Sequence, residues 1–271
     1  MPALVLRGRF VTFEGPEGSG KSTQIDLLTR RLELEGYSCT RTREPGGTTI
    51  GQQLRSMLLD PDRPELAPAA EALLLLGDRA QHVHEVIRPA LAAGQCVLCD
   101  RYVDSTIAYQ GIGMGLDVRT LERIARFATG GLVPDLTVLL DLNVRTGLKR
   151  RRSAWRERTG EINRIDKRNV AFHQRVRDGY LALAMREPTR FLVLDARQPP
   201  EVIAGQIWQR VVGMLDERAS AMSVSISSQL PLPLGEMWLA PALLEQIRRL
   251  ARRLTVTSAR SSRSAVLGVT G

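Results

Sequence analysis

The sequence predicts an α/β domain, spanning about residues 9–214, in which helices cover both faces of a five-stranded parallel sheet. Short, nearly continuous aliphatic runs alternate with stretches of helical apolar spacing, which is typical of parallel strands joined by crossover helices. Hydrophobic residues make up 43% and charged residues 25% of the 271 residues, which excludes a disordered or fibrous chain. No apolar run approaches the roughly 20 residues of a membrane span.

The first expected strand, residues 9–14, ends in a glycine-rich turn that leads into a helix. In that helix Ile25, Leu28 and Leu32 recur at helical spacing, and the pattern stops at a glycine. The second strand is expected at residues 37–42. A Pro-Gly-Gly sequence then breaks the chain before the next helix.

Helices are expected at residues 48–59 and 68–93, the second with Pro89 as its kink or end. The remaining three strands are apolar enough to be buried on both faces, and they are expected at residues 95–100, 135–141 and 191–195. These segments complete the sheet.

The chain changes character after residue 215, and we divide it there. Residues 1–215 hold the α/β domain, and residues 216–235, which are small, polar and proline-containing, are interpreted as a linker. Residues 236–271 are expected to form an amphipathic basic helix followed by a loose Ser/Arg-rich tail.

Charge and cysteine content indicate the partners and the compartment. The net charge of +9 lies in two segments, with +6 in residues 149–168 and +3 from residue 216 onward. A compact polyanion such as a nucleoside triphosphate explains the first segment as well as a nucleic acid does, so nucleic acid and membrane are not expected partners. Three cysteines and the lack of a secretory pattern at the start favour a reducing, cytoplasmic setting.

A complete phosphate-loop motif, G-x-x-x-x-G-K-[ST], lies between the first expected strand and helix, which is the context it requires. Its glycines let backbone N–H groups surround a phosphate chain, while Lys21 would contact the β- and γ-phosphates and Ser22 would ligate Mg²⁺. The expected ATP-binding residues are Gly15, Pro16, Glu17, Gly18, Ser19, Gly20, Lys21 and Ser22. No N-K-x-D motif is present, which excludes an ordinary GTPase.

Further polar motifs follow the second and third expected strands, at the edge where open α/β sheets bind ligands. They are Glu44-Pro-Gly-Gly-Thr, Asp100-Arg-Tyr and Ser105-Thr-Ile-Ala-Tyr-Gln. Together with the phosphate loop and residues 54–55 and 78–82, these motifs resemble those of bacterial thymidylate kinases in order and spacing, over about residues 10–212.

The resemblance implies a P-loop nucleoside-monophosphate-kinase fold with a C-terminal extension. It also implies transfer of the γ-phosphate of Mg·ATP to dTMP, giving dTDP for dTTP biosynthesis, by a homodimer. Phosphoryl transfer requires mainly alignment and charge neutralisation, which basic residues can supply. Asp100 would ligate Mg²⁺ through water or orient the acceptor, and Arg101 would contact phosphate.

Acceptor recognition is assigned through the same resemblance. Glu17 would hold the 3′-hydroxyl of dTMP, Arg55 its phosphate, and Arg79 and Gln110 the O4 and N3 edge of thymine. Unpaired polar groups in such a pocket would penalise the wrong base. The expected dTMP-binding residues are Glu17, Glu44, Arg55, Arg79, Arg101, Ser105 and Gln110.

A lid over ATP is expected at about residues 147–168. In the similar bacterial enzymes whose phosphate loop has a glycine at the position of Gly18 instead of an arginine, the lid supplies the catalytic arginine. The candidates are Arg151, Arg152, Arg156 and Arg158, with no ranking among them; with Lys21, Asp100 and Arg101 they complete the expected catalytic set. Three residues depart from the family pattern: Leu75 replaces a stacking aromatic, Met114 an arginine and Asn163 an acid.

Two other functions remain open from the sequence. One is a P-loop kinase for a different nucleoside monophosphate. The other is a non-catalytic ATP-binding protein that associates with nucleic acid through the basic C-terminal segment. Cys96, Cys99 and the histidines are expected to pack rather than to bind a metal.

Overall fold

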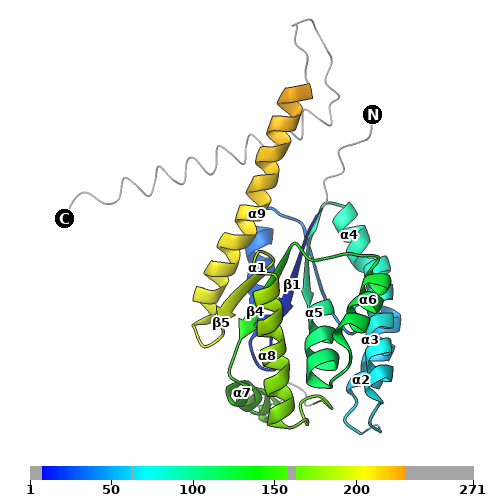
Figure 1. Cartoon of the computed structure of the whole chain (residues 1–271). Helices are drawn as coiled ribbons and strands as arrows, with labels where there is room; N and C mark the ends of the chain where they lie inside the picture. Colours follow the sequence, from blue (N-terminus) through cyan, green and yellow to red (C-terminus); the bar gives the residue numbers. More distant parts are fainter. Residues whose placement is uncertain (1–7, 63, 158–162, 230–271) are drawn as a thin grey trace, which may run out of the picture. The chain divides into compact units, whose positions relative to one another are not determined.

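The structure, a computed structural model, describes residues 8–62, 64–157 and 163–229, with side chains up to residue 215. The strands are β1 (Arg9–Glu14), β2 (Cys39–Arg43), β3 (Cys96–Asp100), β4 (Leu136–Asp141) and β5 (Phe191–Asp195). All pairings are parallel and the order in the sheet is β2-β3-β1-β4-β5, which confirms the predicted five-stranded parallel sheet. Figure 1 shows β1, β4 and β5 of this sheet.

The helices connect these strands on both faces. They are α1 (Lys21–Leu34), α2 (Thr49–Leu59), α3 (Pro68–His82), α4 (Arg88–Ala92), α5 (Val103–Thr106), α6 (Val118–Thr129), α7 (Val144–Arg156), α8 (Val170–Arg186) and α9 (Pro200–Gln229). Two π-helical segments, η1 (Val83–Ile87) and η2 (Ile107–Gly113), continue α3 and α5. The long helix expected at 68–93 is therefore α3, η1 and α4 in succession, with Pro89 in the first turn of α4.

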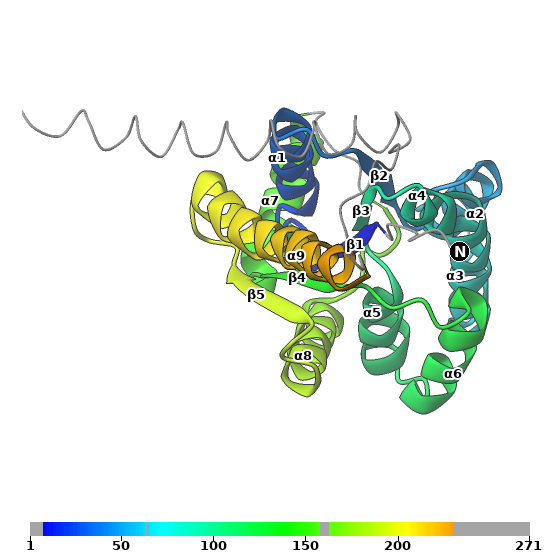
Figure 2. The same cartoon turned by 90° about the horizontal axis from the view of Figure 1, so that it is seen from above.

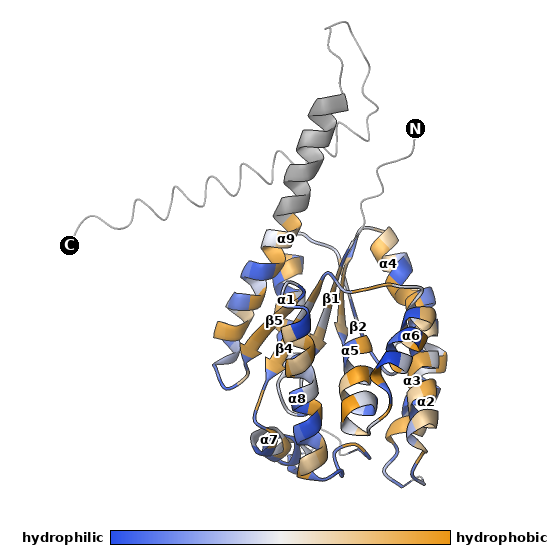
Figure 3. Cartoon of the chain, viewed as in Figure 1, coloured by the Kyte–Doolittle hydropathy of each residue, from blue (hydrophilic) through white to orange (hydrophobic). Residues whose placement is uncertain are grey.

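Alternating residues of the central strands face two apolar layers. Val11 and Phe13 of β1 pack with α1 and the first part of α9, whereas Phe10 packs on the opposite face with η1. On that opposite face α8 packs against β4 and β5, and residues of η2 and α6 belong to the same apolar cluster. Figure 2 shows helices on either side of the sheet. Figure 3 shows the apolar colouring concentrated on the strands and on helix sides turned toward them, as a two-layered core requires.

Strand register places the polar strand ends at one edge. Phe13 of β1 and Arg43 of β2 both pair with Asp100, the last residue of β3. The phosphate loop follows β1 directly, and β1 lies between β3 and β4, where the strand order reverses. This is the position at which open α/β sheets bind ligands.

The C-terminal boundaries remain largely outside the described residues. The chain divides into two units, residues 1–219 and 220–271. The expected linker, 216–235, differs from the structure in its first part, because α9 continues to Gln229. The other residues of the linker and the basic helix and tail expected at 236–271 lie outside the described residues. Within the described helices, none combines the length and apolar character required to cross a membrane.

Candidate functional site

The phosphate loop delivers an uncapped helix N-terminus to the sheet edge. Gly20, the N-cap of α1, has a left-handed φ of 93°, and no described side chain caps this helix. By contrast, the first turns of α2, α6 and α8 are capped by side-chain oxygens that accept hydrogen bonds from backbone amides, those of Thr48, Asp117 and Asn169. The first N–H groups of α1 are therefore left for an anion, and the helix dipole favours negative charge there.

Lys21 bonds back to the main chain of the phosphate loop. Its side chain is buried, and its Nζ donates to the carbonyl oxygens of Gly15 at 3.1 Å and Pro16 at 3.2 Å. Burial lowers the pKa of Lys21, and the positive charge of Arg101 adds to that effect. A polyphosphate beside this ammonium would supply the compensating negative charge.

Backbone packs directly on backbone where the loop meets α7. Gly18 has a φ of 71°, and a Cβ built on it would lie 2.3 Å from the carbonyl oxygen of Gly147. A Cβ on Gly147 would lie 2.2 Å from the carbonyl oxygen of Glu17. Neither position has room for a side chain, so the phosphate loop and α7 are in direct main-chain contact.

Two oxygen ligands suited to Mg²⁺ lie beside the loop. The Ser22 hydroxyl is 3.3 Å from Oδ2 of Asp100, and Oδ1 of Asp100 is buried with no hydrogen-bond partner among the described residues. Hydroxyl and carboxylate oxygens are the donors that Mg²⁺ prefers. An unpaired buried carboxylate oxygen is costly unless a cation or donor reaches it, so the residues present fit the ion.

Arg101 is held at the centre of a polar network. Its φ of 73° is uncommon for a residue other than glycine and marks a position maintained by its surroundings. Its Nη2 donates to Glu17 at 2.6 Å and to the Tyr109 hydroxyl at 3.1 Å. Burial opposes ionisation of Glu17, but Arg101 and Lys21 outweigh it and lower its pKa to about 2. Glu17 therefore remains a carboxylate that can accept hydrogen bonds.

Glu14 is hydrogen-bonded to the residues that surround Arg101. It accepts hydrogen bonds from the Tyr102 amide at 2.7 Å, the Ser105 hydroxyl at 2.6 Å and the Tyr180 hydroxyl at 2.9 Å. Ser105 and Tyr180 also accept hydrogen bonds from Arg101. Glu14 thus orders the residues that fix the Arg101 guanidinium.

The titration of Glu14 gives a testable pH dependence. Burial, with the negative charge of Asp104 as the second cause, raises the pKa of Glu14 from 4.5 to about 7. The folded state then retains a proton that the unfolded state has lost, so this contribution is complete below pH 4.5 and disappears by about pH 7. We expect stability to fall by roughly 3 kcal/mol over that window from this group.

Urea unfolding at pH 4.5, 5.5, 6.5 and 7.5 measures this effect in the parent and in Glu14→Gln, which should show a flatter dependence. Glu33→Gln, at an exposed position on α1, is the matched control and should keep the parental slope. An equally steep slope in Glu14→Gln would show that another group causes the dependence.

Glu44 and Arg79 form a buried ion pair on the other side of the edge. Arg79 Nε donates to Glu44 at 2.7 Å, while its Nη1 and Nη2 donate to the Thr106 hydroxyl at 2.9 Å and the Tyr102 carbonyl at 2.8 Å. Both ion-pair side chains are 2% exposed. The guanidinium is therefore held in one position by the protein's own contacts.

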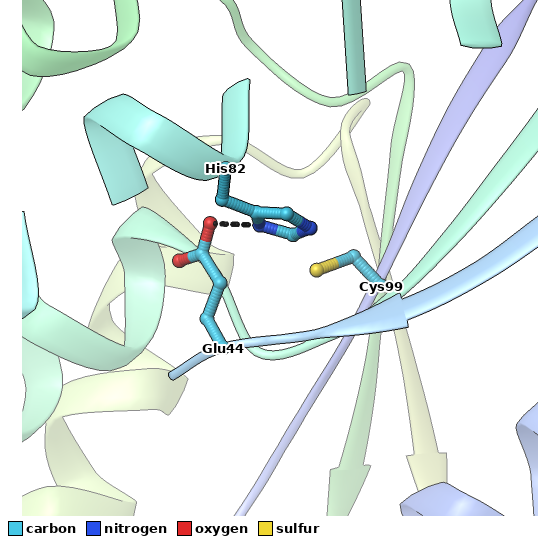
Figure 4. Close-up of side chains that lie close together, drawn as sticks. All are labelled: Glu44, His82 and Cys99. Atoms are coloured by element: carbon cyan, nitrogen blue, oxygen red, sulfur yellow. Dashed lines mark hydrogen bonds and ion pairs between the residues drawn. The ribbon is translucent and has the colours of Figure 1, made fainter. Parts of the chain in front are cut away.

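Glu44, His82 and Cys99 converge behind this pair (Figure 4), and their potential metal-ligating atoms lie within 4.8 Å of one another. His82 nevertheless has partners on both ring nitrogens, Glu44 at 2.8 Å and the Thr42 hydroxyl at 2.6 Å. Burial raises the pKa of the Cys99 thiol well above its usual value, and the thiol donates to the Arg101 carbonyl at 3.1 Å. The cluster is thus a satisfied hydrogen-bond network, consistent with the expected packing role of Cys99.

A cavity of about 530 Å³ joins the phosphate loop to the Glu44–Arg79 region, which is within the size range of small-molecule sites. The structure brings the seven expected acceptor residues into its lining: Glu17, Glu44, Arg55, Arg79, Arg101, Ser105 and Gln110. Residues 17–22 of the loop and Asp100 line it as well. Arg55 also donates from Nη1 to the Pro45 carbonyl at 3.0 Å, which turns its side chain across the cis Glu44–Pro45 turn.

The lid candidates occupy different positions. Arg151 lines the cavity and its Nε lies 3.2 Å from Asp166, whereas Arg152 and Arg156 are exposed on α7 outside the lining. Arg158 lies outside the described residues. Arg150, which the sequence analysis did not single out, also lines the cavity.

The three departures from the family pattern have structural counterparts. Leu75 lines the cavity and so keeps an apolar surface there. Asn163 accepts from the amides of Ile165 and Asp166 at 2.9 and 3.1 Å, which caps a turn beside the cavity. Met114 packs against the apolar layer around Tyr109.

Besides Arg150, sequence reasoning missed four residues of the polar network: Glu14, Glu71, Tyr109 and Tyr180. Tyr109 lies within a motif already singled out, so its position was a usable signal. Glu71 accepts from Gln110 at 2.9 Å and from Arg164 at 2.7 Å, and Tyr180 bonds to Glu14 across 166 residues of sequence. Contacts this distant leave no local pattern.

Comparison with known proteins agrees with the geometry. A family model described as thymidylate kinase matches residues 13–207. The chain is 53% identical over 217 residues to a thymidylate kinase of Desulfovibrio desulfuricans, covering 79% of this chain and 99% of that protein. It is 53% identical over 206 residues to one of Thermomicrobium roseum, covering 76% and 95%. The crystal structure of a thymidylate kinase from Ehrlichia chaffeensis matches with a TM-score of 0.61 and 29% identity, over 76% of this chain and 98% of that chain.

Proposed function

The chain belongs to the thymidylate kinase family and phosphorylates dTMP with ATP, and from that premise we propose how the cavity is divided between the two substrates. The observation that carries the proposal is the lining itself. The same cavity is lined by residues 17–22 of the phosphate loop and by Arg79 and Gln110. A phosphoryl group passing between two nucleotides needs such a continuous, positively charged space.

At the donor end, the amides of the phosphate loop and Lys21 would bind the β- and γ-phosphates. The uncapped N-terminus of α1 supports this assignment, because its N–H groups have no side-chain competitor among the described residues. Ser22 and Asp100 would hold Mg²⁺, which when bound neutralises phosphate charge. Lys21 and Arg101 add positive charge from the protein itself.

At the acceptor end, Arg55 and Arg101 would bind the dTMP phosphate and Glu17 the sugar 3′-hydroxyl. The low pKa of Glu17, about 2, supports an ionised acceptor at that position. Arg79 would donate to thymine O4 and Gln110 would meet N3. Ser105 and Glu44 act through their contacts, Ser105 on Arg101 at 3.2 Å and Glu44 on Arg79 at 2.7 Å.

A lid arginine would complete the charge around the transferring group, and among the four candidates we propose Arg151. Its position in the cavity lining supports this choice. Closure of residues 147–168 would bring positive charge over the phosphates and exclude water.

The proposal also covers the cellular compartment and the oligomeric state of the enzyme. Three free cysteines support a reducing, cytoplasmic compartment. A homodimer follows from the family resemblance, and exposed apolar side chains on α3 and α6, such as Leu73 and Phe127, could contribute to its interface.

A coupled ADP-release assay with dTMP, dUMP, UMP, CMP and AMP tests the acceptor site. We expect the highest kcat/KM for dTMP and poor use of CMP and AMP, because their base edges place an acceptor or a bulkier ring against Arg79 and Gln110. A preference for CMP or AMP would overturn the assignment of these two base-reading residues.

A further inference from the structure

Glu71 of α3 connects the base-reading residue Gln110 to the C-terminal part of the lid, around Arg164 and Arg168. Its side chain is 2% exposed and lines the cavity. Oε1 accepts from Gln110 Nε2 at 2.9 Å, and Oε2 accepts from Arg164 Nη2 at 2.7 Å. A second arginine, Arg168, lies 3.8 Å from Oε2. Both carboxylate oxygens are therefore engaged, Oε1 by the Gln110 amide and Oε2 by arginine guanidinium groups.

Glu71 accepts a hydrogen bond on each carboxylate oxygen, and the acceptor role of Oε1 fixes the Gln110 amide. The NH₂ end must face Glu71, so the carbonyl oxygen is held at the other end of the amide. No described residue donates to Oε1 of Gln110, although the side chain is 3% exposed and lines the cavity. The amide thus presents an acceptor, rather than a donor, to a base bound there.

We propose that Glu71 is a positioning residue that determines base choice by fixing the Gln110 amide in this one orientation. Thymine and uracil carry an N–H at ring position 3 and can donate to the fixed oxygen. Cytosine carries a lone pair at that position, so two acceptors would face each other in a buried site. This inference rests on the acceptor site proposed above.

The second contact of Glu71 requires a separate control. Arg164 is anchored to α2 as well, because its amide donates to the Leu59 carbonyl at 3.2 Å. Loss of Glu71 would release both the Gln110 amide and the Arg164 side chain. An effect on base choice must therefore be distinguished from an effect on the segment around residue 164.

The test compares kcat/KM for dTMP and dCMP in the parent and in Glu71→Gln. A glutamine at 71 can present either end of its amide, so Gln110 can reverse and donate to cytosine N3. We expect the ratio of kcat/KM for dTMP to that for dCMP to fall about 10-fold or more. Arg164→Lys keeps a cation opposite the carboxylate while disturbing the other contacts of Arg164, and there both values should fall together with the ratio unchanged.

A double variant, Glu71→Gln with Arg164→Gln, removes both charges of the ion pair together, so that neither is left without its partner. It replaces the single variant in the kcat/KM comparison if Glu71→Gln does not fold. It should show the same fall in ratio. A parental ratio in the folded Glu71 variants, or an equal fall in Arg164→Lys, would overturn the inference. A parent enzyme that does not prefer dTMP to dCMP would instead overturn the proposed acceptor site.

Discussion

Replacement of Arg151 by alanine should lower kcat for dTDP formation about 10³-fold, the lower end of the range for an arginine that neutralises a transferring phosphoryl group. Arg151 lines the cavity and acts on Glu17 electrostatically, so it lies close to the phosphate loop. Because its partner Asp166 is only 4% exposed, loss of this ion pair should also lower the melting temperature, so kcat is compared at a temperature at which both proteins are folded. Single-turnover measurement with saturating ATP and dTMP isolates the chemical step.

Arg152→Ala is the matched control, since it removes the same side chain one position along α7 from an exposed site. We expect less than a threefold change in kcat there. If kcat of Arg152→Ala falls as much as that of Arg151→Ala, α7 acts on catalysis through its total positive charge rather than through one arginine. If Arg151→Ala retains parental kcat, the proposed lid arginine is wrong and Arg150 becomes the next residue to replace.

Replacement of Lys21 by alanine should lower kcat about 10²–10³-fold, as expected when one preorganised positive donor to a developing charge is lost. Lys21 Nζ also donates to two carbonyls of the phosphate loop, so KM for ATP should rise as the loop loosens. The coupled ADP-release assay measures both constants. Circular dichroism melting shows whether the variant is folded.

Lys149→Ala provides the control for a lost lysine, because Lys149 is exposed on α7 outside the cavity lining. It should keep parental kinetics. A folded Lys21→Ala enzyme that still forms dTDP at the parental rate would contradict the assignment of the donor site to the phosphate loop.

The sheet and the donor site could be predicted because their signals are local. Aliphatic runs such as residues 95–100 identify buried strands, and the glycines and lysine of the phosphate loop follow one strand directly. The structure places Gly15, Gly18 and Gly20 at positive φ, which only a glycine adopts easily. The spacing of the glycines in the motif was therefore enough to predict the backbone conformation of the phosphate loop.

The helix boundary near residue 216 was harder to predict, because composition is a weak guide there. Residues 219–228 are small and polar, which is typical of a linker, but alanine and serine are tolerated in helices. No proline occurs between Pro200 and Pro231, so nothing in this stretch forbids helix, and α9 continues to Gln229.

The polar network could not be predicted because its members are distant in sequence. Glu71 reaches Arg164 across 93 residues, and Arg101 reaches Tyr180 across 79. Such contacts depend on how α3 and α8 pack, which no local pattern encodes. The sequence therefore identified residues that face the substrates better than residues that hold them in place.

The close approach of Gly18 to Gly147 restricts how this enzyme can evolve. A side chain at position 18 would collide with the main chain of α7, because a Cβ there would lie 2.3 Å from the Gly147 carbonyl oxygen. A single substitution therefore cannot introduce an arginine at position 18, since α7 would have to withdraw first. Any change at this contact requires mutually dependent changes in the loop and the helix, and a lineage with this packing is expected to keep both glycines.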